Sequence, residues 1–224
     1  KFNAEVVRKV AAVAVKKARQ LKAARVGTIL HGAGVGGLDP QVAAHALTEG
    51  SMLGGYAYTK YKSTDDQKQA ALPREVVIVE HGDRQKIRAI AAGIKAGEIY
   101  AQATIFAREL VNEPASNMTP KDLAEAARQI AKSAPGMEVK ILNRAQCEKL
   151  GMGAYLGVAR GSDHEPYFIH LVYQPSGSNP KPQTPNPKSI TLEKLRWPRR
   201  FLEFGVWKFG VAAGSRAMDS SQAM

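Results

Sequence analysis

The chain has 224 residues, of which 44% are hydrophobic and 23% charged, ordinary values for a soluble globular protein. This composition excludes a disordered tail and a collagen-like repeat. It also excludes a disulfide scaffold, because the single cysteine, Cys147, has no partner within the chain. The formal net charge of +12 suggests a partner rich in phosphate or anionic lipid.

A helix is predicted over residues 4–25, where alanine and valine can form one apolar stripe. Eight basic residues against Glu5 give residues 1–25 a charge of +7, and two interpretations stay open: a solvated helix face or a nucleic-acid-binding face. The region lacks the continuous apolar core of a signal peptide, and no later run is long enough to span a bilayer. A soluble, cytoplasmic protein without a membrane partner is expected. The first residue, Lys1, indicates a processed or incomplete chain.

Between residues 26 and 62 the pattern alternates between strand and helix. A short buried strand is predicted over 26–30 and a helix over 40–52, with Asp39 as its N-cap and Pro40 at its first position. Residues 56–62 alternate like a strand or an extended segment, and residues 65–72 read as a polar loop.

The middle of the chain continues this alternation. A strand is predicted over 75–79 and a helix over 83–110, although Gly93 and Gly97 weaken the prediction for the middle of the helix. A further helix should follow Thr119 and end near residue 133, because an N-cap threonine, a proline and an acid at the third position mark a helix start.

Further elements are predicted as strands over 137–142 and 167–173 and a short helix over 144–150. Strands that alternate with helices indicate an α/β protein with a largely parallel or mixed sheet. The proline-rich residues 175–188 read as a linker, and no periodic pattern is visible after residue 192.

Three glycines, Gly32, Gly34 and Gly37, fit the G-x-G-x-x-G pattern of dinucleotide-binding loops. The acidic residue that such a fold places about 20 residues further on is missing, since that distance falls at Met52, and Glu80 is more than 40 residues away. A glycine-rich turn required by backbone geometry is the favoured interpretation, and a nicotinamide-dependent oxidoreductase is the weaker alternative.

Histidine and cysteine provide no recognisable catalytic or metal-binding motif. The five histidines contain no H-E-x-x-H pattern and no pair at metal-ligand spacing; they are His31, His45, His81, His164 and His170. His170, in the middle of a predicted strand, is expected to be an ordinary core or surface residue. Cys147 lies in a short amphipathic helix, where a catalytic role is disfavoured.

Three segments are more specific than a generic α/β pattern. They are EGSMLGGY with KYKS at 49–63, ARELVNEPASNMTP at 107–120 with Leu123 and Ala124, and LGMGAYLGVARGS at 150–162. Their order and spacing resemble the leucyl aminopeptidases, also called cytosol aminopeptidases, of peptidase family M17, over about residues 26–190.

The resemblance implies a fold and a domain organisation. It implies a macro-domain-like N-terminal α/β domain, a connecting helix and the start of an α/β catalytic domain. The corresponding ranges are 1–82 for a partial N-terminal domain, 83–111 for the helix, 112–192 for the start of the catalytic domain and 193–224 for a divergent basic tail. Members of this family remove N-terminal residues, preferentially leucine, from peptides. They use two divalent metals (zinc, manganese or magnesium), form homohexamers and are mostly cytosolic or plastidic.

The same resemblance implies that this chain lacks the metal ligands, because the family's carboxylate-rich motifs would follow Ile190. In their place the chain continues with TLEKLRW, and the acids beyond it, Glu193, Glu203 and Asp219, fit no family motif. Lys194 lies near the position of the metal-binding lysine but lacks its glycine neighbours, so no catalytic, metal or cofactor residue is assigned. We therefore expect this polypeptide to be inactive by itself and to bind no metal.

Two further expectations concern the ends of the chain. The break after Ile190 is explained by the hypothesis of a shifted reading frame, a mis-spliced exon or a wrong gene model. A different function class is a nucleic-acid-binding fragment that acts through the basic residues 1–25, at most a weak interaction.

Overall fold

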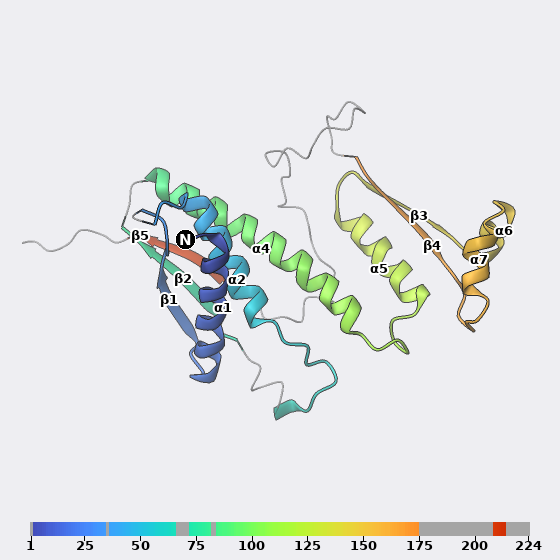
Figure 1. Cartoon of the computed structure of the whole chain (residues 1–224), viewed down its shortest axis with the longest axis horizontal. Helices are drawn as coiled ribbons and strands as arrows, with labels where there is room; N and C mark the ends of the chain where they lie inside the picture. Colours follow the sequence, from blue (N-terminus) through green and yellow to red (C-terminus); the bar gives the residue numbers. More distant parts are fainter. Residues whose placement is uncertain (1, 35, 66–71, 82–83, 175–207, 214–224) are drawn as a thin grey trace, which may run out of the picture. The chain divides into compact units, whose positions relative to one another are not determined.

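The computed structural model describes residues 2–34, 36–65, 72–81, 84–174 and 208–213 (Figure 1). The chain divides into two compact units, and each is described by itself. Unit 1 comprises Lys1–Ala107 with Gly205–Met224, and unit 2 comprises Arg108–Phe204. The helices and strands confirm the predicted α/β class. The four predicted domain ranges stay a prediction.

Unit 1 is built on a three-stranded parallel sheet with the strand order β1-β2-β5. Its elements, in chain order, are α1 (Ala4–Gln20), β1 (Arg25–Ile29), α2 (Pro40–Gly55), β2 (Glu75–Glu80), most of α4 (Arg84–Asn112) and β5 (Lys208–Ala213). The predicted helices and strands of this region are confirmed, although α1 ends at Gln20 and not at residue 25. The exceptions are the strand alternative for residues 56–62 and β5, which the sequence did not predict.

The core of unit 1 lies between its helices and one face of the sheet. Val7 of α1, Leu47 of α2, Ile78 of β2 and Ile90 of α4 are all buried and belong to one apolar cluster. Complete burial of a branched side chain contributes roughly 1.5–3 kcal/mol. Packing of these helices on the sheet therefore stabilises this unit.

Glycines set the distance between the helices of unit 1. A Cβ atom on Gly50 of α2 would lie 2.4 Å from the Arg8 carbonyl oxygen of α1. A Cβ atom on Gly93 of α4 would lie 2.2 Å from the Gln41 carbonyl oxygen of α2. Real Cβ atoms do not approach an oxygen atom so closely. The contacts of α2 with α1 and with α4 therefore require glycine, which has no side chain, at these two positions.

In its described residues, unit 2 contains a two-stranded antiparallel sheet and three helices, besides the end of α4. Its elements are α5 (Pro120–Ser133), β3 (Met137–Leu142), α6 (Arg144–Lys149), α7 (Gly153–Ala159) and β4 (Phe168–Tyr173), with β3 and β4 paired. The predicted start of α5 is confirmed, because Thr119 and Asp122 form a reciprocal capping box with Pro120 in the first turn. The short helix α7 was not predicted.

The structure contradicts one predicted alternative, and several other predicted segments lie outside the described residues. Residues 56–62 form no strand: the chain is irregular up to Thr59 and then turns, so the strand alternative is wrong. No described strand pairs with this segment, and alternation alone does not supply hydrogen-bond partners. The loop predicted at 65–72 lies largely outside the described residues, and so do the linker at 175–188 and most of the tail at 193–224.

Candidate functional site

The glycine-rich loop between β1 and α2 is a turn closed by hydrogen bonds of its own backbone. Gly32, Gly34 and Gly37 all have positive φ angles, which favour glycine. The loop amides of Gly37 and Leu38 donate to the carbonyl oxygens of Gly34 and Gly32. A side chain on Gly32 would also collide with the Phe2 ring. This geometry supports the interpretation as a backbone turn.

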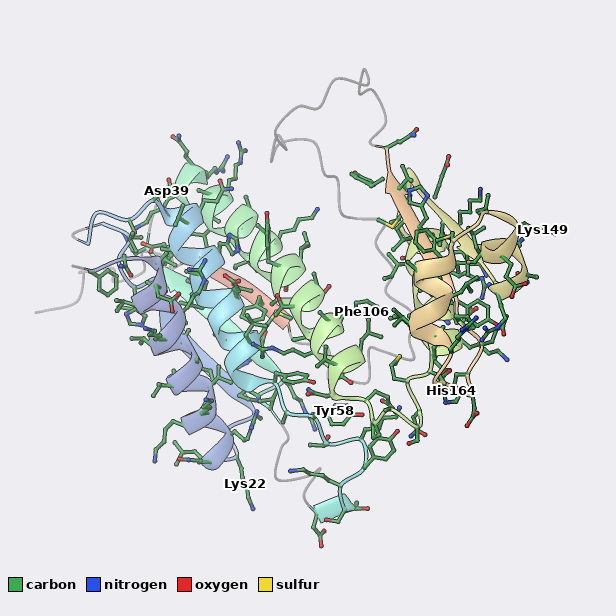
Figure 2. All side chains as sticks on the ribbon, turned by 45° about the vertical axis from the view of Figure 1, so that its right-hand side comes forward. Lys22, Asp39, Tyr58, Phe106, Lys149 and His164 are labelled. Carbon is green, nitrogen blue, oxygen red and sulfur yellow. The ribbon has the colours of Figure 1, made fainter. Side chains whose placement is uncertain are left out.

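The N-terminus of α2, where a dinucleotide would place its pyrophosphate, carries a carboxylate instead. Asp39 accepts hydrogen bonds from the amides of Gln41 and Val42 at 2.9 and 3.1 Å, and Figure 2 shows it at this end of the helix. A pyrophosphate needs those same amides and would meet the negative charge of the carboxylate. The oxidoreductase alternative therefore has no support from this loop.

Half of the basic side chains in the first 25 residues are engaged within unit 1. Arg8 and Lys9 pair with acids on α1 or α2, the Arg19 guanidinium donates to the Gly55 carbonyl, and Arg25 pairs with Glu75. Exposed cations without an ion pair to another described residue remain at Lys16, Lys17 and Lys22, the last at the end of α1 (Figure 2). Nucleic-acid binding stays a prediction from charge alone.

A group of charged and titratable side chains in unit 1 joins α1, α2 and α4. We call it the Glu49 cluster: Arg8, His45, Glu49 and Tyr100. Arg8 Nε donates to Glu49 Oε2 at 2.6 Å, while His45 Nε2 lies 3.7 Å from the same oxygen. The rings of His45 and Tyr100 have centroids 5.1 Å apart and are inclined at 38°. The Glu49 side chain is only 17% exposed, and its carboxylate interacts with Arg8 of α1 and with His45 of α2, whose ring in turn contacts Tyr100 of α4.

Burial sets the protonation of His45. It lowers the pKa of the imidazole; Glu49 opposes the shift, and Arg8 adds to it. His45 Nε2 is buried and makes no hydrogen bond to another described residue, since the Glu49 carboxylate oxygen lies 3.7 Å away. The cluster includes no serine, threonine, cysteine or lysine nucleophile, and none of its residues lines the small cavity between α1, α2 and the sheet. Its geometry therefore supports a packing role and not acid–base catalysis.

We expect unit 1 to lose stability on acidification through His45. A base whose pKa is lowered by folding binds protons more readily when unfolded, so the free energy of unfolding falls as pH drops below about 6.5. His45→Gln should therefore show a shallower pH dependence between pH 7.5 and 5.5. Hydrogen exchange of α2 amides measures this directly, and equal slopes for the variant and the parent chain would contradict the prediction.

The cavity between α1, α2 and the sheet is too small for a substrate. Its volume is about 30 Å³, and its lining is mainly apolar, with Thr28, His31 and Ser51 as polar members. Such a volume admits a water molecule, whereas ligand pockets measure roughly 300–1,000 Å³.

The described residues do not fit the two metals that the resemblance implies. Among the residues that the structure describes, no group of three or more His, Cys, Asp or Glu side chains could hold a metal ion. Two-metal hydrolysis needs a dense set of oxygen ligands. The acids after Ile190, namely Glu193, Glu203 and Asp219, lie outside the described residues, as does Lys194.

The remaining candidate residues occupy ordinary structural positions. Cys147 of α6 is fully buried, which does not match the partly exposed setting of a catalytic thiolate. His170 is exposed on β4, in agreement with the surface alternative. No described helix is both long and apolar enough to cross a lipid bilayer.

The segments that carry the resemblance are distributed over both units. Residues 49–63 cover the end of α2 and the irregular segment after it, residues 107–124 cover the end of α4 and the start of α5, and residues 150–162 contain α7.

The sequence did not predict the Glu49 cluster. The only available signal was His45 and Glu49 at i and i+4 on one helix; nothing connected them to Arg8, 41 residues earlier.

Two family models match the chain. The cytosol aminopeptidase family N-terminal domain matches residues 1–65, and the catalytic domain of the same family matches residues 105–192. A probable cytosol aminopeptidase from Sulfurihydrogenibium sp. is 38% identical over 178 residues, covering 80% of this chain and 34% of that protein.

Solved structures show the same likeness. A tomato leucine aminopeptidase mutant superposes with a TM-score of 0.65 and 30% identity, covering 77% of this chain and 34% of that one. The bottromycin maturation enzyme BotP in complex with Mn gives a TM-score of 0.60 and 31% identity, covering 79% of this chain and 34% of that one. The chain thus spans about a third of the length of these relatives.

Proposed function

The chain belongs to the cytosol aminopeptidase family, and from this premise we propose that it supplies the N-terminal part of a metal-dependent aminopeptidase. The observation that carries the proposal is the order of the two matches, the N-terminal model before the catalytic model, each within one chain of 224 residues. Removal of N-terminal residues from peptides, with leucine preferred, is the proposed reaction of the whole protein.

The same proposal includes the metal cofactors, the oligomeric state and the cellular location of the whole enzyme. The proposed cofactors are two divalent ions (zinc, manganese or magnesium), and manganese is supported by the BotP structure, which was solved in complex with Mn. Assembly as a homohexamer follows from the family resemblance. A cytosolic location is supported by the name of the Sulfurihydrogenibium relative; a plastid is the alternative.

We propose that residues 1–224 alone do not catalyse the reaction. The described residues provide no set of metal ligands, and the motifs that the resemblance assigns to that role would follow Ile190. Without the ions, neither the attacking water nor the scissile carbonyl is activated. The described part of the chain therefore contributes packing and positioning to the proposed enzyme.

The expected result is that purified chain with Mn²⁺ or Zn²⁺ releases no chromophore from leucine p-nitroanilide. Turnover on the order of 1 s⁻¹ would contradict the inactivity, because it lies within the range of working enzymes. A chimera tests the function itself: residues 1–190 followed by the remaining catalytic segment of the Sulfurihydrogenibium protein. We expect metal-dependent release from the chimera and none from that segment alone. A folded, metal-loaded chimera without activity would overturn the proposed function.

A further inference from the structure

The central strand of unit 1 requires a partner on each side. β2 carries the apolar run Val76–Val79, and Val76 and Ile78 are 2% and 0% exposed. Continuous apolar runs are typical of interior strands in parallel sheets. β1 occupies one side of β2 only, so the other side would present a row of unpaired N–H and C=O groups if nothing covered it.

The strand that covers this side comes from a part of the chain outside both family-model matches. β5 pairs with β2 in parallel over six residues, from Glu75 beside Lys208 to Glu80 beside Ala213. Figure 1 shows it alongside β2. The matches end at residues 65 and 192, so neither family model accounts for this segment.

One aromatic side chain distinguishes this segment from an arbitrary extended peptide. Phe209 lies in register with Val76, and Val76 with Val26, so the three side chains share one face of the sheet. The Phe209 side chain is half-buried and packs against the apolar core cluster. The next residue, Gly210, lies in register with Val77, and a Cβ atom built on it would meet no atom within 4 Å. Recognition therefore combines backbone pairing with one aromatic anchor.

We propose that the edge of β2 opposite β1 is a strand-acceptor site, which binds a short extended segment with an aromatic residue at its second position. Its occupant is residues 208–213 of the same chain. This is strand addition to an exposed sheet edge: main-chain hydrogen bonds supply affinity and alternate side chains supply selectivity. The proposal does not depend on aminopeptidase activity. It gives residues 208–213 a structural role in unit 1.

A disulfide tests both the register and the origin of the strand. Neighbouring strands lie about 4.8 Å apart, within the Cα separation that a disulfide accepts. Val77→Cys with Gly210→Cys in the full chain should therefore oxidise to an intrachain bond and migrate as a compact monomer on a non-reducing gel. The native Cys147 is buried, and the parent chain is the control. A covalent dimer would overturn the assignment to the same chain, and failure to cross-link would overturn the pairing.

Hydrogen exchange tests the anchor. Phe209→Asp in the full chain should raise the exchange rate of the β2 amides by about tenfold or more, because the strand loses its apolar anchor. Gly210→Ala, the neighbouring control, should leave this rate unchanged. A synthetic peptide WKFGVAAG should restore protection in the Phe209→Asp variant, and WKDGVAAG should not. Equal β2 exchange in both variants, or protection by both peptides, would overturn the proposal.

Discussion

Gly93→Ala is expected to destabilise unit 1 by about 3 kcal/mol or more, or to force α2 and α4 apart. The added Cβ atom would lie 2.2 Å from the Gln41 carbonyl oxygen and 2.9 Å from the Ala44 Cβ atom. The first contact is with helix backbone, which cannot rotate away as a side chain can. Overpacking of a well-packed interior costs roughly 1–3 kcal/mol even where side chains can adjust. Hydrogen exchange of α2 and α4 amides is the measurement.

Two other glycines provide matched controls for this prediction. Gly157→Ala in α7 meets no atom within 4 Å and should stabilise that helix by about 0.5–1 kcal/mol. Gly27→Ala in β1 of the same unit also meets open space and should be near neutral. A Gly93→Ala chain with exchange rates equal to those of Gly27→Ala would show that α2 and α4 do not touch through this position.

The helix ends were predictable from sequence because their signals are local. Asp39 with Pro40, and Thr119 with Pro120 and Asp122, satisfy the first amides of α2 and α5 within three residues of each cap. Such signals do not depend on the rest of the fold. The bounds of both helices consequently agree with the sequence pattern at their N-terminal ends.

The glycines inside α4, in contrast, could not be explained from local sequence signals. Gly93 and Gly97 weakened the helix prediction, since glycine is a poor helix former. The structure shows that both positions touch α2: a Cβ atom on Gly97 would lie 2.7 Å from the His45 carbonyl oxygen. A tertiary contact that no local rule reports thus explains the unfavourable residues. β5 was missed for a related reason, because a segment as short as KFGVAA becomes a strand only beside the β2 edge.

The limits of prediction are the same for the candidate sites. The glycine loop could be interpreted correctly, because the missing acidic residue and the Asp39–Pro40 cap are both visible in the sequence. The Glu49 cluster could not, since it needs the packing of α1 on α2 to bring Arg8 to Glu49. Charge alone likewise overstated the basic face of residues 1–25, because the ion pairs that engage Arg8 and Arg25 join residues more than 40 positions apart.

Glu49→Gln is expected to destabilise unit 1 by about 2 kcal/mol at pH 8. The substitution keeps the size of the side chain but removes the charge that faces Arg8 Nε at 2.6 Å. Breaking a fully buried pair costs roughly 3–5 kcal/mol. Arg8 is 35% exposed, so water recovers part of this loss. The control is Glu125→Gln in α5: its partner Arg128 lies 3.3 Å away on the same helix, and both side chains are more than 40% exposed. That change should cost less than about 0.5 kcal/mol.

Acidification should enlarge the effect of Glu49→Gln, which separates the electrostatic account from a simple loss of packing. Glu49 is the contribution that raises the pKa of His45, so its removal leaves burial and Arg8 to lower that pKa further. A histidine with a lower folded-state pKa loses more stability as pH falls below about 6.5. The difference between parent and variant should therefore grow from pH 8 to pH 5.5. An NMR titration should place the His45 midpoint lower in the variant; a constant difference and an unmoved midpoint would show that Glu49 does not act on His45 through its charge.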